Sequence, residues 1–122
     1  MIEIKKITSN LGSIVESNKD IESLVGWSSE DIFEKIGIKQ RYISNEGESS
    51  EILALEAVQK IDYKDLEECD LIISVTNTPG NDFPTIAHFI HSEIGLTKNT
   101  KCLGLNAGCT GFVDALEVVC SF

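Results

Sequence analysis

The segment that most restricts the fold is a nearly continuous apolar and β-branched run, DLIISVT, at residues 70–76. Runs of this kind mark strands that are covered on both faces, as in a parallel sheet between helices. A second short apolar run, containing Cys102, Leu103 and Leu105, predicts another strand, and helical patterns flank both runs. Strands that alternate with helices and are joined by right-handed crossovers predict an α/β architecture.

The remaining elements are predicted from caps, stop residues and periodicity. The alternation in Ile2–Ile7 predicts a first strand, and residues 38–44 predict a short extended piece. Helices are predicted with Asn18 as a cap, from the cap Ser28 to the stop Gly37, from Ser49, and from Pro84 to Gly95. The segment 77–82 is a loop by composition. Sites in such sheets gather at the carboxyl ends of the strands.

Length, charge and hydropathy limit the classes of protein. A chain of 122 residues forms one domain at most, or part of one. The net charge of −10 argues against general nucleic-acid binding, which needs a basic face. No apolar run approaches the length of a membrane span, and the first residues, MIEIKK, do not resemble a signal peptide. We therefore expect a cytoplasmic location, no membrane and no nucleic-acid partner.

Cys109 stands at a tight turn between the second predicted strand and a helical pattern of Phe112, Val113, Leu116 and Val119. This position places its sulfur at a helix N-terminus, where unpaired N–H groups and the helix dipole favour a thiolate. The thiolate is the nucleophilic form of cysteine, so a thiol here is suited to attack acyl groups. The sequence therefore predicts Cys109 as a catalytic nucleophile.

The other cysteines suggest no site. Cys69, Cys102, Cys109 and Cys120 form no CxxC pair, so neither a zinc knuckle nor, without secretion, a disulfide framework is expected. Most of them are expected to be small buried apolar residues. His88 and His91 could share one helix face and bind a metal with Asp82 or Glu93, but a polar helix surface is the favoured interpretation and no metal is expected.

Two further patterns have alternative interpretations. Gly104, Gly108 and Gly111 follow a strand and open a helix, as in nucleotide-binding modules, but their spacing is G-x-x-x-G-x-x-G rather than G-x-G-x-x-G. Lys35, Lys39 and Arg41 place three cations within seven residues of an otherwise acidic chain. This cluster is either a solvated turn or a small patch that binds a phosphate or a carrier protein.

Four segments, in order, resemble one family. The segment GIKQRYI at 37–43, the run at 70–76, Phe83-Pro84-Thr85, and NAGCTGF at 106–112 are similar to segments of β-ketoacyl-acyl-carrier-protein synthase III, of the thiolase-like superfamily. The resemblance covers the whole chain but only the amino-terminal part of a longer family chain. Residues 1–122 are thus expected to be the amino-terminal part of a thiolase-like domain, cut within the helix after Cys109.

The resemblance implies a thiolase-like fold with mixed sheets between helices, and a homodimer. It implies that Cys109 accepts an acyl group from an acyl-CoA and that malonyl-acyl-carrier protein then condenses with it after decarboxylation. These are substrates, and no further cofactor is implied. The Cys109 backbone N–H would be one oxyanion donor. The His and Asn that family members use for decarboxylation lie in the carboxy-terminal part, so this piece alone is expected to be inactive or nearly so.

The resemblance also suggests substrate-binding residues. Phe83 matches a Phe that lines the partner's acyl pocket, and Lys35, Lys39 and Arg41 match basic positions near the CoA and carrier entrance. One departure is Asp31, which stands where the family often has a Trp that stacks on the CoA adenine, while Trp27 lies four residues earlier. The superfamily also includes thiolases, hydroxymethylglutaryl-CoA synthases and starter-loading acyltransferases, and these remain alternatives, as does an inactive piece or binding module.

Overall fold

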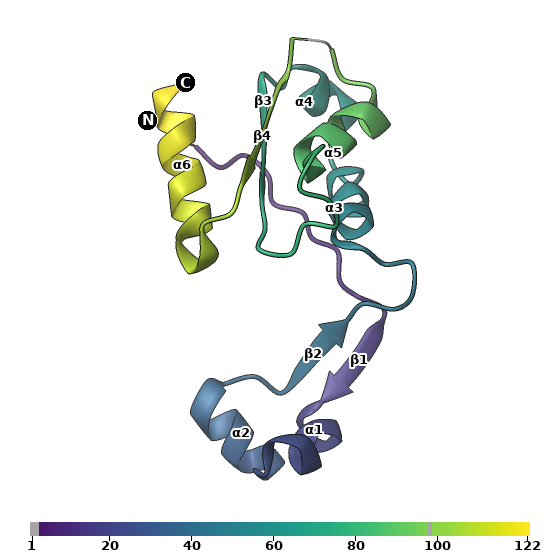
Figure 1. Cartoon of the computed structure of the whole chain (residues 1–122), viewed down its shortest axis with the longest axis vertical. Helices are drawn as coiled ribbons and strands as arrows, with labels where there is room; N and C mark the ends of the chain where they lie inside the picture. The colour runs from purple at the N-terminus through teal and green to yellow at the C-terminus, as the bar shows by residue number, and fades with distance from the viewer. Residues whose placement is uncertain (1–2, 98) are drawn as a thin grey trace. The chain divides into compact units, whose positions relative to one another are not determined.

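A computed structural model describes residues 3–97 and 99–122 as two compact units. The larger unit comprises Met1–Asn10 and Ser49–Phe122, and the smaller unit is Leu11–Glu48. The smaller unit folds as a hairpin-like strand pair that carries two short helices. The larger unit holds a pair of parallel strands with helices on both sides (Figure 1).

The larger unit confirms the α/β prediction. Its elements are α3 (Ser50–Val58), α4 (Tyr63–Glu67), β3 (Leu71–Val75), α5 (Ile86–Ile94), β4 (Lys101–Leu105), a 3₁₀ turn η1 (Gly108–Thr110) and α6 (Gly111–Ser121). Strands β3 and β4 are parallel, with Leu71 opposite Lys101 and Val75 opposite Leu105. Helix α5 packs on both strands and against α3, while α6 contacts β3 (Figure 1).

The core of the larger unit lies on the α5 side of the strands. The buried apolar side chains there are those of Leu55, Ile86, Ala87, Ile90 and Leu96. Gly104 of β4 lets α5 approach closely, because a Cβ at that position would lie 2.5 Å from Cγ2 of Thr85. Thr85 is the N-cap of α5, so Pro84 precedes the helix instead of lying in its first turn as predicted; Gly95 ends the helix in the left-handed conformation.

The smaller unit pairs β1 (Ile14–Ser17) with β2 (Gln40–Ile43) in antiparallel fashion. Between them lie α1 (Asn18–Val25) and α2 (Ser29–Ile36). Ser28 caps α2 and Gly37 ends it at φ 72°, as predicted from the sequence. The predicted cap Asn18 is wrong by one residue, since Ser17 is the N-cap of α1.

Asn18 is instead a buried polar residue at the centre of the smaller unit. Its side-chain N–H donates to the carbonyl oxygen of Ile38 at 2.7 Å, and its Oδ1 accepts from Nη2 of Arg41 at 3.0 Å. A buried amide is favourable only when its hydrogen bonds are satisfied. Asn18 therefore ties the start of α1 to the segment that leads into β2.

The predicted first strand is wrong over the residues that the structure describes. Residues 3–7 form no strand, and the side chains of Ile4 and Ile7 are exposed; Ile2 lies outside the described residues. A strand needs a hydrogen-bonded neighbour, which alternation in the sequence does not supply. Within residues 3–97 and 99–122, no helix combines the length and the apolar character needed to cross a membrane.

Candidate active site at the carboxyl ends of two parallel strands

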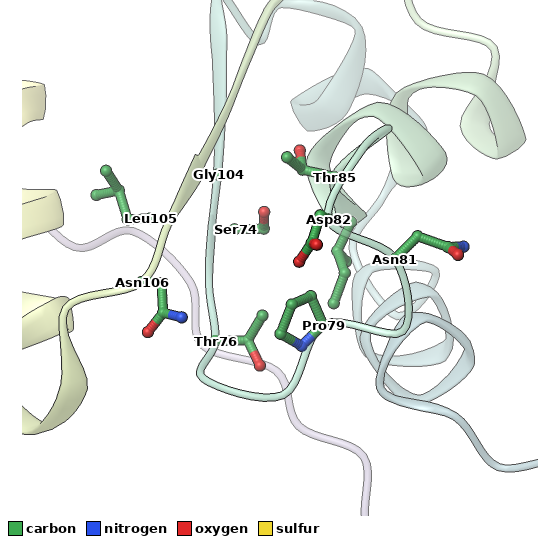
Figure 2. Close-up of a pocket in the computed structure, with 10 residues that line it drawn as sticks. Ser74, Thr76, Pro79, Asn81, Asp82, Thr85, Gly104, Leu105 and Asn106 are labelled. Atoms are coloured by element: carbon green, nitrogen blue, oxygen red, sulfur yellow. The ribbon is translucent and has the colours of Figure 1, made fainter.

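Strands β3 and β4 end at the same edge, and the loops that follow them border a cavity of about 140 Å³. Figure 2 shows its lining residues around the strand ends and the loop after β3. They are Ser74, Thr76, Pro79, Asn81, Asp82, Thr85, Ile86, Gly104, Leu105 and Asn106. Hydroxyl, amide and carboxylate groups thus surround the small cavity, next to the turn that carries Cys109.

Cys109 lies in the turn between β4 and α6, as the strand–turn–helix pattern predicts. The turn is tightened into the 3₁₀ element η1, and Thr110 is the N-cap of α6, so the cysteine immediately precedes the helix cap. The Cys109 side chain is exposed and its thiol is free. Among the residues that the structure describes, its backbone N–H makes no hydrogen bond outside those internal to helices and strands. The thiol is therefore available to a reactant.

Several contacts hold this turn in place. The Gly108 N–H donates to Oδ1 of Asn77 at 3.1 Å, and Gly108 adopts a left-handed φ of 59° that favours glycine. The Thr110 hydroxyl lies 2.9 Å from both the Ala107 carbonyl oxygen and Oδ2 of Asp114. At Gly111, a Cβ would collide with Cγ1 of Val75 on β3. The start of α6 is therefore fixed to the sheet.

The loop after β3 is tied to the N-terminus of α3. The Ser50 hydroxyl donates to the Thr78 carbonyl oxygen at 2.9 Å, and the Gly80 N–H donates to Oε1 of Glu51 at 2.8 Å. Hydrogen bonds from the Glu51 backbone, the Ser49 side chain and the Gly80 backbone hold the pKa of Glu51 below its ordinary value, against a smaller opposing effect of burial. Helix α3 thus anchors the loop that bears Asn77 and Phe83.

Phe83 is 77% exposed at the end of this loop. Its ring lies edge-on to the His88 ring, with 5.3 Å between the ring centroids. Nδ1 of His88 is 2.9 Å from Oγ1 of Thr85, and Nε2 of His91 is 2.8 Å from the Thr97 carbonyl oxygen. Each histidine is thus engaged by its own helix or the following turn. Within the described part of the chain, His, Cys, Asp and Glu side chains form no group of three that could hold a metal ion.

The remaining cysteines differ from the sequence expectation. Cys69 and Cys102 are half-buried, but Cys120 is exposed at the far end of α6 and is not a buried apolar residue. Burial raises the pKa of the Cys102 thiol, with a further contribution from nearby Cys69. Cys102 belongs to β4 and Cys69 lies two residues before β3, whereas Cys120 lies in the last turn of α6.

The predicted cationic residues lie in the smaller unit, whereas Cys109 and Phe83 lie in the larger one. Nζ of Lys35 is 4.1 Å from the Trp27 ring centroid, and Nζ of Lys39 is 5.2 Å from that of Phe33. Arg41 bonds to Asn18 and lies 3.4 Å from Oε2 of Glu16. The two lysines therefore contact aromatic rings, while the charge of Arg41 is partly neutralised within its own unit.

The aspartate at the position where the family often has a tryptophan has a structural role. The Asp31 N–H donates to Oγ of Ser28 at 3.1 Å, and the Ser28 hydroxyl donates to Oδ2 of Asp31 at 2.8 Å. These bonds cap α2. Trp27 remains 47% exposed next to the cap. Asp31 thus helps to cap α2, and the exposed Trp27 ring lies just before this cap in the sequence.

Asn77 is the site residue that sequence reasoning missed. The sequence places it in a loop that follows a buried strand, which is a position typical of functional residues, but nothing local shows which backbone group its amide contacts. The contact joins residues 31 positions apart, and only the parallel pairing of β3 and β4 brings them together.

Comparison with known proteins gives the family. No protein-family model matches the chain. It is 36% identical over 123 residues to a β-ketoacyl-[acyl-carrier-protein] synthase III of Clostridium acetobutylicum, covering 99% of this chain and 38% of the relative. It is 38% identical over 120 residues to that of Allorhizobium ampelinum, covering 93% of this chain and 37% of the relative.

A solved structure agrees with these relatives. The crystal structure of the Thermus thermophilus β-ketoacyl-[acyl-carrier-protein] synthase III matches with a TM-score of 0.86 and 31% identity, over 98% of this chain and 38% of that one. The chain thus spans a little over a third of the length of the proteins that it matches. This chain is a homologue of part of β-ketoacyl-acyl-carrier-protein synthase III and shares the thiolase-like fold of that family.

Proposed function

We propose that this chain carries the acyl-accepting cysteine of a β-ketoacyl-acyl-carrier-protein synthase III, an acyltransferase that begins fatty-acid or related lipid or polyketide synthesis. The observation that carries the proposal is the exposed Cys109 between a parallel strand and the helix that follows it, in a homologue of this family. An exposed thiol at such a turn is placed for nucleophilic attack.

In the first half-reaction, the Cys109 thiolate attacks the carbonyl carbon of an acyl-CoA thioester. The new S–C bond forms as the bond to the CoA sulfur breaks, and CoA leaves as a thiolate that takes a proton from solvent. The backbone N–H of Cys109 would donate to the oxyanion of the tetrahedral intermediate. The negative charge of the attacking thiolate is favoured by the nearby N-terminus of α6, which spans Gly111–Ser121.

In the second half-reaction, malonyl-acyl-carrier protein loses CO₂ and its carbanion attacks the acyl-cysteine carbonyl. A C–C bond forms, the S–C bond breaks, and Cys109 is released as a thiolate. The resemblance assigns the decarboxylating step to a His and an Asn that no residue of this chain matches. His88 and His91 are already engaged by Thr85 and Thr97, so we expect this chain alone to perform the first half-reaction at most.

Substrate and partner contacts are part of the same proposal. The exposed ring of Phe83 is suited to line an acyl pocket in a homodimer, where it would reach the partner. Lys35, Lys39 and Arg41 are suited to meet the phosphates of CoA or of a carrier's prosthetic arm. Lys35 already lies over Trp27, and an ammonium beside an exposed indole ring offers both charge and a stacking surface. We place the enzyme in the cytoplasm, with no metal and no cofactor other than its substrates.

The test is intact mass spectrometry after incubation with acetyl-CoA and with longer acyl-CoAs. We expect an acyl mass gain that Cys109→Ala abolishes and that Cys120→Ala, the matched exposed thiol at the other end of α6, retains. A gain that persists in Cys109→Ala would overturn the assignment of the nucleophile. No gain in this chain or in a longer form carrying the rest of the family fold would overturn the acyl-enzyme mechanism.

A further inference from the structure

Gly108, the residue before the nucleophile, is held on both sides of its peptide backbone. Its N–H donates to Oδ1 of Asn77 at 3.1 Å, and its carbonyl oxygen accepts the N–H of Gly111. A peptide bond is planar, so the Gly108 carbonyl and the Cys109 N–H share one rigid plane. Fixing Gly108 therefore fixes the direction in which the Cys109 N–H points.

Glycine restricts its own backbone dihedral angles less than any other residue, so it does little to fix the orientation of the peptide plane that follows it. Gly108 sits at φ 59°, and a Cβ built on it would meet no atom within 4 Å other than those of its chain neighbours, so the space on that side of the residue is open. Glycine also has the widest choice of backbone conformations. The hydrogen bond that the Gly108 N–H donates to Oδ1 of Asn77 therefore restrains a residue that is otherwise free to change conformation.

The acceptor itself is well anchored. Asn77 lies two residues after the end of β3. The Thr78 N–H donates to Oγ1 of Thr76 at 3.1 Å, and Ser50 and Glu51 hold Thr78 and Gly80. The loop is thus fastened to the end of β3 and to the N-terminus of α3. The amide oxygen of Asn77 is therefore held in place, and it can position the turn after β4 through its hydrogen bond with Gly108.

We propose that Asn77 is a positioning residue, which orients the backbone N–H of Cys109 through Gly108 for the acyl-transfer step. This inference rests on the proposed function, because an oriented N–H matters only where an oxyanion forms. Asn77 touches no reacting atom and acts through the turn. Removing its acceptor should slow attack on a thioester carbonyl more than it slows reactions of the same thiol that need no oxyanion donor.

Two reactions of Cys109 separate orientation from thiol reactivity. Acetylation by acetyl-CoA passes through a tetrahedral oxyanion, whereas alkylation by iodoacetamide displaces iodide at a saturated carbon and forms none. Both use the thiolate, so the ratio of the two rates at Cys109 cancels changes in thiolate fraction and exposure. Asn77→Ala removes the acceptor and Asn77→Asp keeps an acceptor oxygen at the same reach. Gln59→Ala is the control, because it removes an exposed amide of the larger unit that lies outside the cavity and whose side chain has no hydrogen bond among the described residues.

We expect Asn77→Ala to lower the acetylation-to-alkylation ratio by about three- to tenfold, the effect of losing one hydrogen bond. Asn77→Asp should retain the ratio of the unaltered chain, and Gln59→Ala should leave it unchanged. In parallel, hydrogen exchange of the Gly108 amide, followed by NMR, should accelerate in Asn77→Ala and stay slow in the other two variants. A well-dispersed amide spectrum shows that each variant is folded.

The proposal is overturned if Asn77→Ala leaves the ratio unchanged, or if Gln59→Ala lowers it equally. Alkylation of wild-type Cys109 without any acetylation would instead count against the proposed function. The exchange measurement then decides the role of Asn77 by itself: an unchanged Gly108 rate in Asn77→Ala overturns it, and a faster rate supports the hold on the turn.

Discussion

The four cysteines form two classes by exposure, which gives a prediction at the scale of single residues. Cys109 and Cys120 are exposed, whereas Cys69 and Cys102 are half-buried. A raised pKa leaves less of the Cys102 thiol as thiolate at neutral pH, so its alkylation should be slow for two reasons. We expect limiting iodoacetamide at pH 7.5 to modify Cys109 and Cys120 at least tenfold faster than Cys102, as measured by peptide mass spectrometry.

Unfolding in urea supplies the control for the thiol experiment. All four thiols should react at similar rates once the chain is unfolded, because exposure and the raised pKa of Cys102 belong to the folded state. Rapid alkylation of Cys102 in the native chain would show that the β3–β4 pair opens readily in solution.

At the scale of elements, the Ser28 cap of α2 gives a second prediction. The Ser28 hydroxyl oxygen accepts the Asp31 N–H, one of the groups that a helix N-terminus leaves without a partner. Ser28→Ala should lower the free energy of unfolding of the smaller unit by about 1 kcal/mol. The measurement is urea unfolding followed by the fluorescence of Trp27, the single tryptophan of the chain.

Ser44→Ala is the matched control for this cap. Ser44 is exposed in the same unit, and its hydroxyl makes no hydrogen bond among the described residues. Its replacement should leave the urea midpoint unchanged. An equal loss of stability in both variants would mean that Ser28 contributes no more than any surface serine.

At the scale of the whole molecule, the carboxylates held by hydrogen bonds gather mainly in the smaller unit. Hydrogen bonds from Ser17 lower the pKa of Asp20, those from Ser29 lower that of Glu22, and those from Asn45 and Ser13 lower that of Glu48. A lowered folded-state pKa contributes stability that is present above the unfolded value and is lost as the pH falls through the folded value. The smaller unit should therefore lose stability in acid.

We expect the urea midpoint reported by Trp27 to fall between pH 7 and about pH 3.5, across the ordinary range of carboxyl titration. Glu22→Gln should weaken this pH dependence because it removes one of the titrating groups. Glu34 is exposed on α2, and its side chain makes no hydrogen bond among the described residues. Glu34→Gln should therefore preserve the pH dependence of the urea midpoint. A midpoint that is constant over this pH range would contradict the role of these bonds.

The larger unit presents an apolar groove, which gives a second prediction at this scale. Ile4, Ile7, Ile61, Phe112 and Leu116, with Lys6 and Thr8, line a cavity of about 400 Å³, and Ile7 and Phe112 are 82% and 65% exposed. Exposed apolar surface of this kind promotes association. We expect the chain to self-associate with rising concentration in sedimentation experiments, and Phe112→Ser to reduce this association.

The control is Leu24→Ser, which removes an apolar side chain of the smaller unit that is 83% exposed and lies outside this groove. It should change self-association less than Phe112→Ser. A chain that stays monomeric at all concentrations, or an equal effect of the two variants, would contradict the prediction.

The sequence predicted the elements whose signals are local. The cap Ser28 and the stops Gly37 and Gly95 lie where they were predicted, and the helix predicted to begin at Ser49 begins at Ser50 with Ser49 as its cap. A cap is specified by residues within one helical turn, which is why these signals are local. The run that forms β3 is also local, since its β-branched residues favour a strand covered on both faces.

Most of the elements and contacts that were not predicted from the sequence depend on residues far away in the chain. Strand β1 was missed because Ile14–Ser17 is short and acquires its pairing from β2, about 25 residues later. Helix α4 has five residues, too few for a periodic pattern. The predicted strand at 2–7 was wrong in its described part for the same reason, and the Asn77–Gly108 contact exists only once two strands have paired.

Gly104 and Gly111 are needed for the fold, whereas Cys109 is needed only for the proposed reaction. One glycine admits Thr85 and the other admits Val75, so a side chain at either would push a helix away from the strands. The thiol of Cys109 is exposed, and a folded chain does not depend on it. Under selection for folding alone, random mutagenesis would retain both glycines and let Cys109 drift, whereas under selection for acyl transfer all three positions would become invariant.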